Sequence, residues 1–229
     1  MTHQLLFSSP MTDTAAAPSA LPDGQALAAL VAGKLCHDFI SPAGAISSGL
    51  DLLKDPSAQD MRDDAMGLIE ASARKMVALV AFARVAFGAS TSAERFSGAE
   101  LGELVTALSE GGRATLDWRV DGGDYSKAEA RALVNLAWLT LAALPSGGAA
   151  VVTARRDGGA LQITGLAEGA RARLKPEAVA GLAGRPLGEG LQGQWIQPYW
   201  LWLTARDAGG SLEAQAEDGR VSLTVHMPN

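Results

Sequence analysis

Apolar residues recur every three or four positions from Asp23 to Gly88, which predicts two long amphipathic helices. The first begins at about Asp23, a suitable N-cap, and ends near Leu53, and Pro42 inside it is expected to bend it. The second follows the turn at residues 54–57 and ends at Gly88. Because two helices alone cannot enclose a core, a second copy is expected to complete a homodimeric four-helix bundle. The positions predicted to face inward are Leu35, Phe39, Ala43, Ile46, Leu50 and Leu53 in the first helix and Met61, Ala65, Leu68, Ser72, Met76, Leu79, Ala83 and Ala86 in the second.

The pattern changes after residue 94, where short alternating runs and turn signals appear between helical stretches. They predict a mainly antiparallel sheet packed against helices, so the fold class is α+β: a helical hairpin followed by an α/β sandwich. The predicted domains are a disordered tail at 1–22, the hairpin at 23–90 and the sandwich at 94–229. Helices are expected at 97–109, 127–144 and 198–207, strands at 114–120, 149–155, 160–164, 211–216 and 220–227, and a variable stretch at 165–193.

The composition narrows the classes of function. The 229 residues carry a formal net charge of −6, and no cluster of Lys and Arg favours nucleic-acid binding. Charged residues interrupt every apolar run before about 18 residues, so no membrane span is predicted. A single cysteine excludes an internal disulfide, and a cytoplasmic location is the simplest expectation.

His37 is the candidate reactive residue because the helical period turns it away from the predicted inward face. It is two residues from Leu35 and from Phe39, which is about 200° around the helix axis. A single histidine on a helix is usually only a polar surface residue, so its neighbours decide the interpretation.

Three neighbours of His37 favour nucleophilic chemistry. Asp38 can hold the proton of one ring nitrogen and stabilise the cation that forms when the other nitrogen reacts. Ser41, one turn onward, can contact phosphoryl oxygens or a water molecule. The bend expected at Pro42 can place the ring for in-line attack. His37, Asp38 and Ser41 are therefore the predicted catalytic residues.

The run HDFISP at residues 37–42 resembles the phospho-acceptor box of histidine kinases, which lies on the first helix of a dimeric helical hairpin. Residues 131–145 are similar to the N box of the kinase ATP-binding domain, with Asn135 at its first asparagine. Leu139 replaces the second asparagine, which holds Mg²⁺ in that family. The terminal strands of that domain are kept at 209–228.

Two further kinase motifs are degenerate. Residues 164–169 (TGLAEG) lack the aspartate that reads adenine, and the glycine-rich lid is reduced to GLQG at 190–193. The resemblance therefore implies an ATPase-like fold that has lost its nucleotide chemistry, with no cofactor bound by this chain.

Both halves resemble the ChpT-type histidine phosphotransferases of alphaproteobacteria, notably at residues 35–43 and 55–66. The resemblance implies a relay in which His37 takes a phosphoryl group from the receiver domain of a hybrid histidine kinase. The receiver domains of response regulators then take it from His37. Mg²⁺ is expected in the acidic pocket of each receiver. No nucleic-acid or membrane partner is implied.

A partner helix is expected to dock on the small residues that follow His37 along the exposed face of the first helix. An alternative is that Gly and Ser here only avoid clashes within the bundle. The basic run at 171–175 is predicted to be a solvated loop, and contact with an acidic receiver is the alternative. The predicted docking residues are Gly44, Ala45 and Ser48, next to Ser41, flanked by Arg62 and Met66.

Two other functions stay open at this point. A divergent histidine kinase would still bind ATP and would label itself from it. A non-catalytic dimeric scaffold would sequester regulators and would keep its activity without His37.

Overall fold

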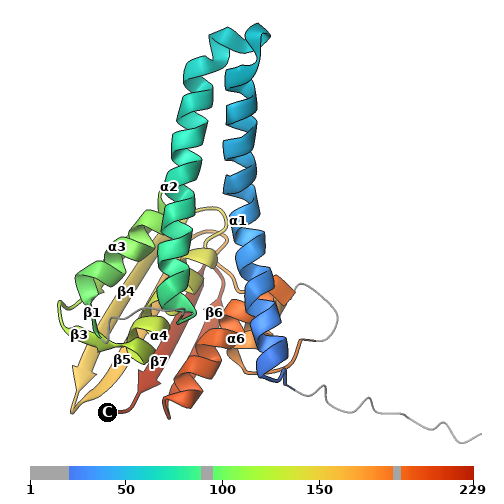
Figure 1. Ribbon diagram of the computed structural model, residues 1–229. Coiled ribbons are helices and arrows are strands. Elements are labelled where there is room, and N and C mark those ends of the chain that lie inside the picture. Colours follow the sequence, from blue (N-terminus) through green and yellow to red (C-terminus); the bar gives the residue numbers. More distant parts are fainter. Residues whose placement is uncertain (1–20, 89–94, 188–191) are drawn as a thin grey trace, which may run out of the picture.

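Two long antiparallel helices form the hairpin in the computed structural model, which describes residues 21–88, 95–187 and 192–229. They are α1 (Gly24–Lys54) and α2 (Arg62–Ala86), joined by the 3-10 turn η1 (Pro56–Met61), as Figure 1 shows. The Asp23 side chain caps α1 by accepting a hydrogen bond from the Ala26 amide at 2.8 Å. Pro42 is buried within α1, which continues through it. The predicted hairpin is confirmed, and of the predicted tail only residues 21 and 22 lie within the described part.

Four of the positions predicted to face inward in a two-chain bundle are exposed within the single chain. Ala43, Leu50, Met61 and Leu68 are exposed, whereas Pro42 and Gly49 are buried. The cause is close contact at Gly49, where a Cβ atom would lie 2.6 Å from Ile69 Cγ1. The line of contact between α1 and α2 therefore passes through residues 42 and 49 rather than through residues 43 and 50.

The C-terminal half contains a five-stranded sheet with the strand order β2-β4-β5-β7-β6. The β2–β4 pair is parallel and the other three pairs are antiparallel, which confirms the mainly antiparallel sheet. A separate two-stranded sheet pairs β1 (Arg95–Ser97) with β3 (Asp124–Ser126). The five strands are β2 (Ala114–Val120), β4 (Gly148–Asp157), β5 (Ala160–Glu168), β6 (Ser211–Glu217) and β7 (Arg220–Met227).

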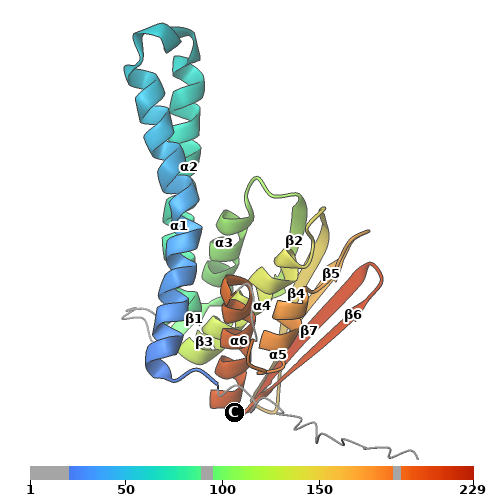
Figure 2. The ribbon, with the colours of Figure 1, turned by 90° about the vertical axis from the view of Figure 1, so that its right-hand side faces the viewer.

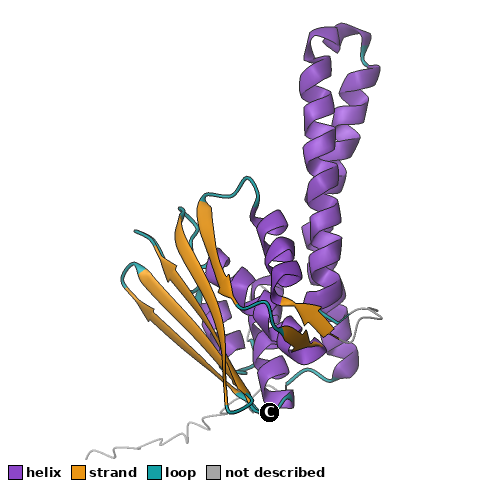
Figure 3. Cartoon of the chain, turned by 90° about the vertical axis from the view of Figure 1, so that its left-hand side faces the viewer, coloured by secondary structure: helices purple, strands orange, loops and turns teal. Residues whose placement is uncertain are grey.

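Helices form a layer between the sheet and the base of the hairpin (Figures 2 and 3). Capping boxes fix two of their starts, because Ser97 and Ser126 each exchange hydrogen bonds with the glutamate three residues later. This two-layer arrangement confirms the α+β class. The helices are α3 (Gly98–Ser109), α4 (Lys127–Ala142), α5 (Pro176–Leu182) and α6 (Gln192–Asp207).

The stretch at 165–193, to which the sequence pattern assigned no helix or strand, contains regular elements. β5 extends to Glu168, α5 lies within the stretch, and α6 begins at Gln192 rather than at Pro198. Pro198 is buried inside α6, so a proline is not the start signal here. Burial of Trp195 and Ile196 stabilises the first turns of α6, which local propensity alone does not predict.

The base of the hairpin packs directly on the C-terminal half. Near the start of α1, Leu27, Leu30 and Val31 contact a buried cluster on α6. At the end of α2, Phe82 and Ala86 belong to the main core. No described helix is both long enough and apolar enough to cross a bilayer.

Candidate functional site

The His37 side chain projects from α1 with 85% of its surface exposed, as the helical periodicity predicts. Its Nδ1 atom lies 3.3 Å from Oδ1 of Asp38. Among the described residues, Nε2 of this ring has no hydrogen-bond partner. An Nδ1–H group that donates to Asp38 leaves the lone pair on Nε2, so an unprotonated nitrogen is accessible to solvent.

Asp38 is held by a second partner. Its Oδ2 forms an ion pair with Nζ of Lys34, one helical turn earlier. Both side chains are more enclosed than His37, with 24% of Asp38 and 14% of Lys34 exposed. The carboxylate is thereby fixed between an ammonium group and the imidazole, in a position to orient the ring and to stabilise positive charge on it.

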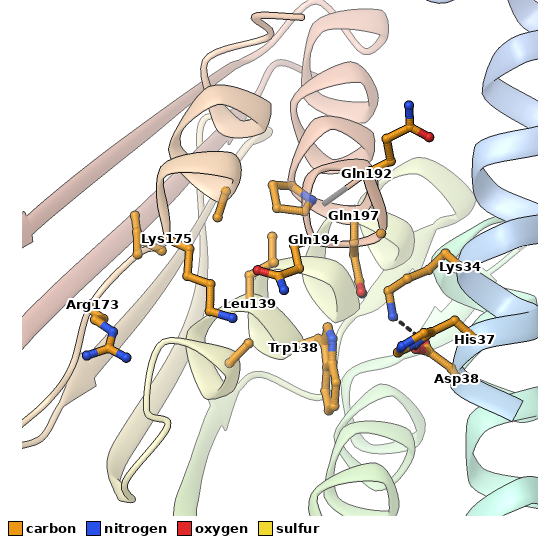
Figure 4. A pocket seen from close by; sticks show the side chains of 15 residues that line it. Lys34, His37, Asp38, Trp138, Leu139, Arg173, Lys175, Gln192, Gln194 and Gln197 are labelled. Carbon is orange, nitrogen blue, oxygen red and sulfur yellow. Dashed lines mark hydrogen bonds and ion pairs between the residues drawn. The ribbon is translucent and has the colours of Figure 1, made fainter. Parts of the chain in front are cut away.

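His37 lies at one wall of a cleft of about 600 Å³ between α1 and the C-terminal half (Figure 4). The opposite wall is formed by α4, by the segment before α5 and by the first turns of α6. Arg173 and Lys175 come from that segment, are exposed, and have no ion-pair partner among the described residues. The cleft therefore holds three cationic side chains, with Lys34, against the single carboxylate of Asp38. Such a surface attracts acidic partners although the whole chain has a net charge of −6.

The predicted docking residues occupy different environments. Gly44 and Ser48 are exposed on the face of α1 that carries His37, at helical spacing from it. Ser41, predicted to be catalytic, is exposed on the same face, but it forms no hydrogen bond with His37, and none of these three residues lines the cleft. Ala45 is the exception, because it is half-buried and turned toward α2. The two α2 residues, Arg62 and Met66, are exposed in its first turns and do not line the cleft.

Several site residues were missed in the sequence. Lys34 had one usable signal, its spacing of four residues from Asp38. Trp138 and Lys175 had none, since they reach the cleft from segments more than a hundred residues away from His37. The basic run was expected to be a solvated loop, with contact to an acidic receiver as the alternative, and two of its members line the cleft.

The positions that resemble a kinase nucleotide site have other roles here. Asn135 is fully buried: its Nδ2 donates to the carbonyl groups of Ala86 and Arg131, both at 2.8 Å, and its Oδ1 accepts from Gln197 at 3.2 Å. Leu139 presents an apolar side chain to the cleft. Part of the reduced lid, residues 190 and 191, lies outside the described residues. Across residues 21–88, 95–187 and 192–229, no three His, Cys, Asp or Glu side chains gather closely enough to hold a metal ion.

Comparison with known proteins connects this arrangement with phosphotransfer. Residues 98–220 match the family described as histidine phosphotransferase C-terminal domain. A curated relative, Protein phosphotransferase ChpT of Brucella abortus (strain 2308), is 32% identical over 195 residues, which is 84% of this chain and 92% of that protein. A solved structure described as a bacterial phosphotransferase superposes with a TM-score of 0.80 at 26% identity, covering 91% of this chain and all of the other.

Proposed function

Because the chain belongs to the histidine phosphotransferase family that includes ChpT, we propose that it relays phosphoryl groups between receiver domains through His37. The donor is the receiver aspartyl phosphate of a hybrid histidine kinase, and the acceptors are the receiver aspartates of response regulators. The observation that carries the proposal is the His37 imidazole itself. It is 85% exposed, oriented by Asp38, and set at the wall of a cationic cleft.

In the first proposed step, Nε2 of His37 attacks the phosphorus atom of the aspartyl phosphate. A P–N bond forms, the P–O bond to the donor carboxylate breaks, and that carboxylate leaves with the bonding electrons. Asp38 accepts a hydrogen bond from Nδ1–H and stabilises the positive charge that develops on the ring. The second step is the reverse reaction with another receiver. Mg²⁺ belongs to the acidic pocket of the receiver in both steps.

We propose that the receiver docks between the two walls of the cleft. On α1 it meets Ser41, Gly44 and Ser48, whose small side chains let a partner helix lie close. On the other wall it meets Arg173 and Lys175, whose charge complements the acidic rim of a receiver site. Arg62 and Met66 stand farther from the cleft and would touch only the outer edge of such a partner.

The relay is proposed to run without ATP. Both hydrogen-bonding groups of the Asn135 amide are engaged inside the protein, and Leu139 offers no ligand to a metal ion. Purified chain with radiolabelled ATP and Mg²⁺ is therefore expected to stay unlabelled, whereas a phosphorylated receiver domain labels it within the same time course. Labelling by ATP alone would instead support the divergent kinase.

We propose that the functional unit is a homodimer with a four-helix bundle. Ile40 on α1 and Val77 on α2 are 71% and 70% exposed, and Leu50 and Val80 are each more than 40% exposed. Apolar side chains at this density along a hairpin are typical of a face that a second copy covers.

Ile40→Asp is accordingly expected to weaken dimerisation by at least about a hundredfold, because the twofold axis places the unfavourable charge in the interface twice. Sedimentation equilibrium over a concentration series measures this directly. Val179→Asp is the matched control, since Val179 is an exposed valine on α5, away from the hairpin. A dimer that tolerates Asp at residue 40 would contradict this interface.

A further inference from the structure

Two helices of the C-terminal half hold the last residue of α2. The carbonyl group of Ala86 has no partner within its own helix, as is usual for the final turn. It accepts hydrogen bonds from Nδ2 of Asn135 on α4 at 2.8 Å and from Nε1 of Trp200 on α6 at 2.9 Å. Ala86 and Asn135 are fully buried and Trp200 is half-buried. A single oxygen atom thus ties the base of the hairpin to both helices.

The same network reaches the wall of the cleft. Oδ1 of Asn135 accepts a hydrogen bond from Nε2 of Gln197 at 3.2 Å, and Gln197 is 3% exposed. The Gln197 side chain lines the cleft across from Lys34 and His37 (Figure 4). Buried hydrogen bonds therefore run without interruption from the end of α2 to the wall that faces the reactive histidine.

A side chain from α4, Arg131, packs against Gly88, where the chain leaves α2. Gly88 has a φ of +71°, and a Cβ atom there would lie 2.1 Å from Nη2 of Arg131. The Arg131 guanidinium lies over the Trp200 ring, 5.8 Å from its centroid. Burial lowers the pKa of Arg131, with Asp207 partly opposing that shift. The Arg131 side chain thus contacts both Gly88, just after α2, and Trp200 on α6.

We infer that Asn135, Gln197 and Trp200 are positioning residues for phosphotransfer, an inference that rests on the proposed function. They fix α2 against α4 and α6, and α1 packs along α2, so they set the separation between His37 and the opposite wall. A receiver that contacts both walls then meets a preformed site, so its binding free energy is not reduced by the cost of aligning them. None of the three acts on the phosphoryl group itself.

The test removes one hydrogen bond and keeps a smaller aromatic ring at the position. Trp200→Phe deletes the Nε1–H donor, while Asn135 still satisfies the Ala86 carbonyl. Trp118→Phe is the matched control, because Nε1 of Trp118 donates to the Gly98 carbonyl at 3.0 Å within the C-terminal half. Each variant is given two phosphoryl donors: a phosphorylated receiver domain, which needs both walls, and phosphoramidate, a small donor that needs only the imidazole.

For Trp200→Phe, kcat/KM with the receiver is expected to fall roughly tenfold while labelling by phosphoramidate keeps its wild-type rate. Trp118→Phe is expected to leave both rates unchanged. A receiver rate within twofold of wild type would overturn the inference, as would an equal loss with both donors, which indicates general damage to the fold. Asn135→Leu, in which the two side chains are close in volume, removes the hydrogen bonds that α4 contributes and repeats the test with the same two donors. If His37→Ala retained transfer, the proposed function itself would fail, independently of these results.

Discussion

His37→Ala is expected to abolish phosphoryl acceptance from a phosphorylated receiver and to stop onward transfer completely. The substitution removes the imidazole that projects from α1 beside Asp38 at the cleft, and the methyl group that replaces it cannot form a P–N bond. Because 85% of the His37 side chain is exposed, its removal leaves no cavity, and the unfolding temperature should stay close to that of the wild type. Autoradiography of both proteins during a time course measures acceptance and transfer.

The control for this variant is His226→Ala. His226 is also exposed, but it lies on β7, in the sheet of the C-terminal half. This variant should accept and transfer the label at the wild-type rate. If His37→Ala retained the relay, the scaffold function would become the better account. If His226→Ala lost it, the reactive residue would have been misassigned.

Asp38→Asn is expected to slow single-turnover transfer by about a hundredfold while leaving the dimer intact. The amide keeps the size of the carboxylate but loses its charge, so it stabilises a positively charged ring less well. It also releases Lys34, whose ammonium group is then free to repel the developing imidazolium. Rapid-quench measurements with saturating phosphorylated receiver separate this chemical effect from binding.

Asp51→Asn is the matched control for Asp38→Asn. Asp51 is an exposed carboxylate on the same helix, 4.0 Å from Lys54, and it lies toward the tip of the hairpin. Its substitution should change the transfer rate by less than twofold, since exposed ion pairs contribute little. A rate for Asp38→Asn equal to that of Asp51→Asn would show that the Asp38 carboxylate has no part in the reaction.

The exposure of His37 could be predicted because it follows from helical periodicity alone. A residue placed two positions from two inward residues must point outward, whatever lies around the helix. The pairing of β4 with β5 and of β6 with β7 could also be predicted from the sequence, because local turn signals specify each hairpin. Together with the helical periodicity, these hairpins indicate the α+β class.

Features that depend on contacts between distant segments could not be predicted from the sequence. The choice between residues 42 and 43, or between 49 and 50, depends on how closely α2 approaches Gly49, which the sequence of α1 does not encode. The cleft joins α1 to α4 and α6, so its opposite wall could not be assigned to His37. Asn135 was interpreted as a remnant of a nucleotide motif, although its partners in the fold are Ala86 and Gln197.

The reuse of Asn135 gives a physical reason why a fold that resembles an ATPase domain can serve a relay. Asn135, at the position that resembles the first asparagine of the kinase N box, joins the hairpin to the C-terminal half. We propose that the second domain has changed from a supplier of phosphate to a fixed wall against which receivers dock. The basic residues before α5 line the cleft that also contains His37, as such a wall requires.

The most direct measurement is to locate the phosphoryl group after a brief reaction with a phosphorylated receiver domain. The chain is digested at alkaline pH, where a P–N bond survives, and the labelled peptide is sequenced by mass spectrometry. The account predicts one modified residue, His37, whose label is lost in acid and passes to a second receiver when one is added. A label on a serine or an aspartate, or one on His37 that no receiver can remove, would contradict it.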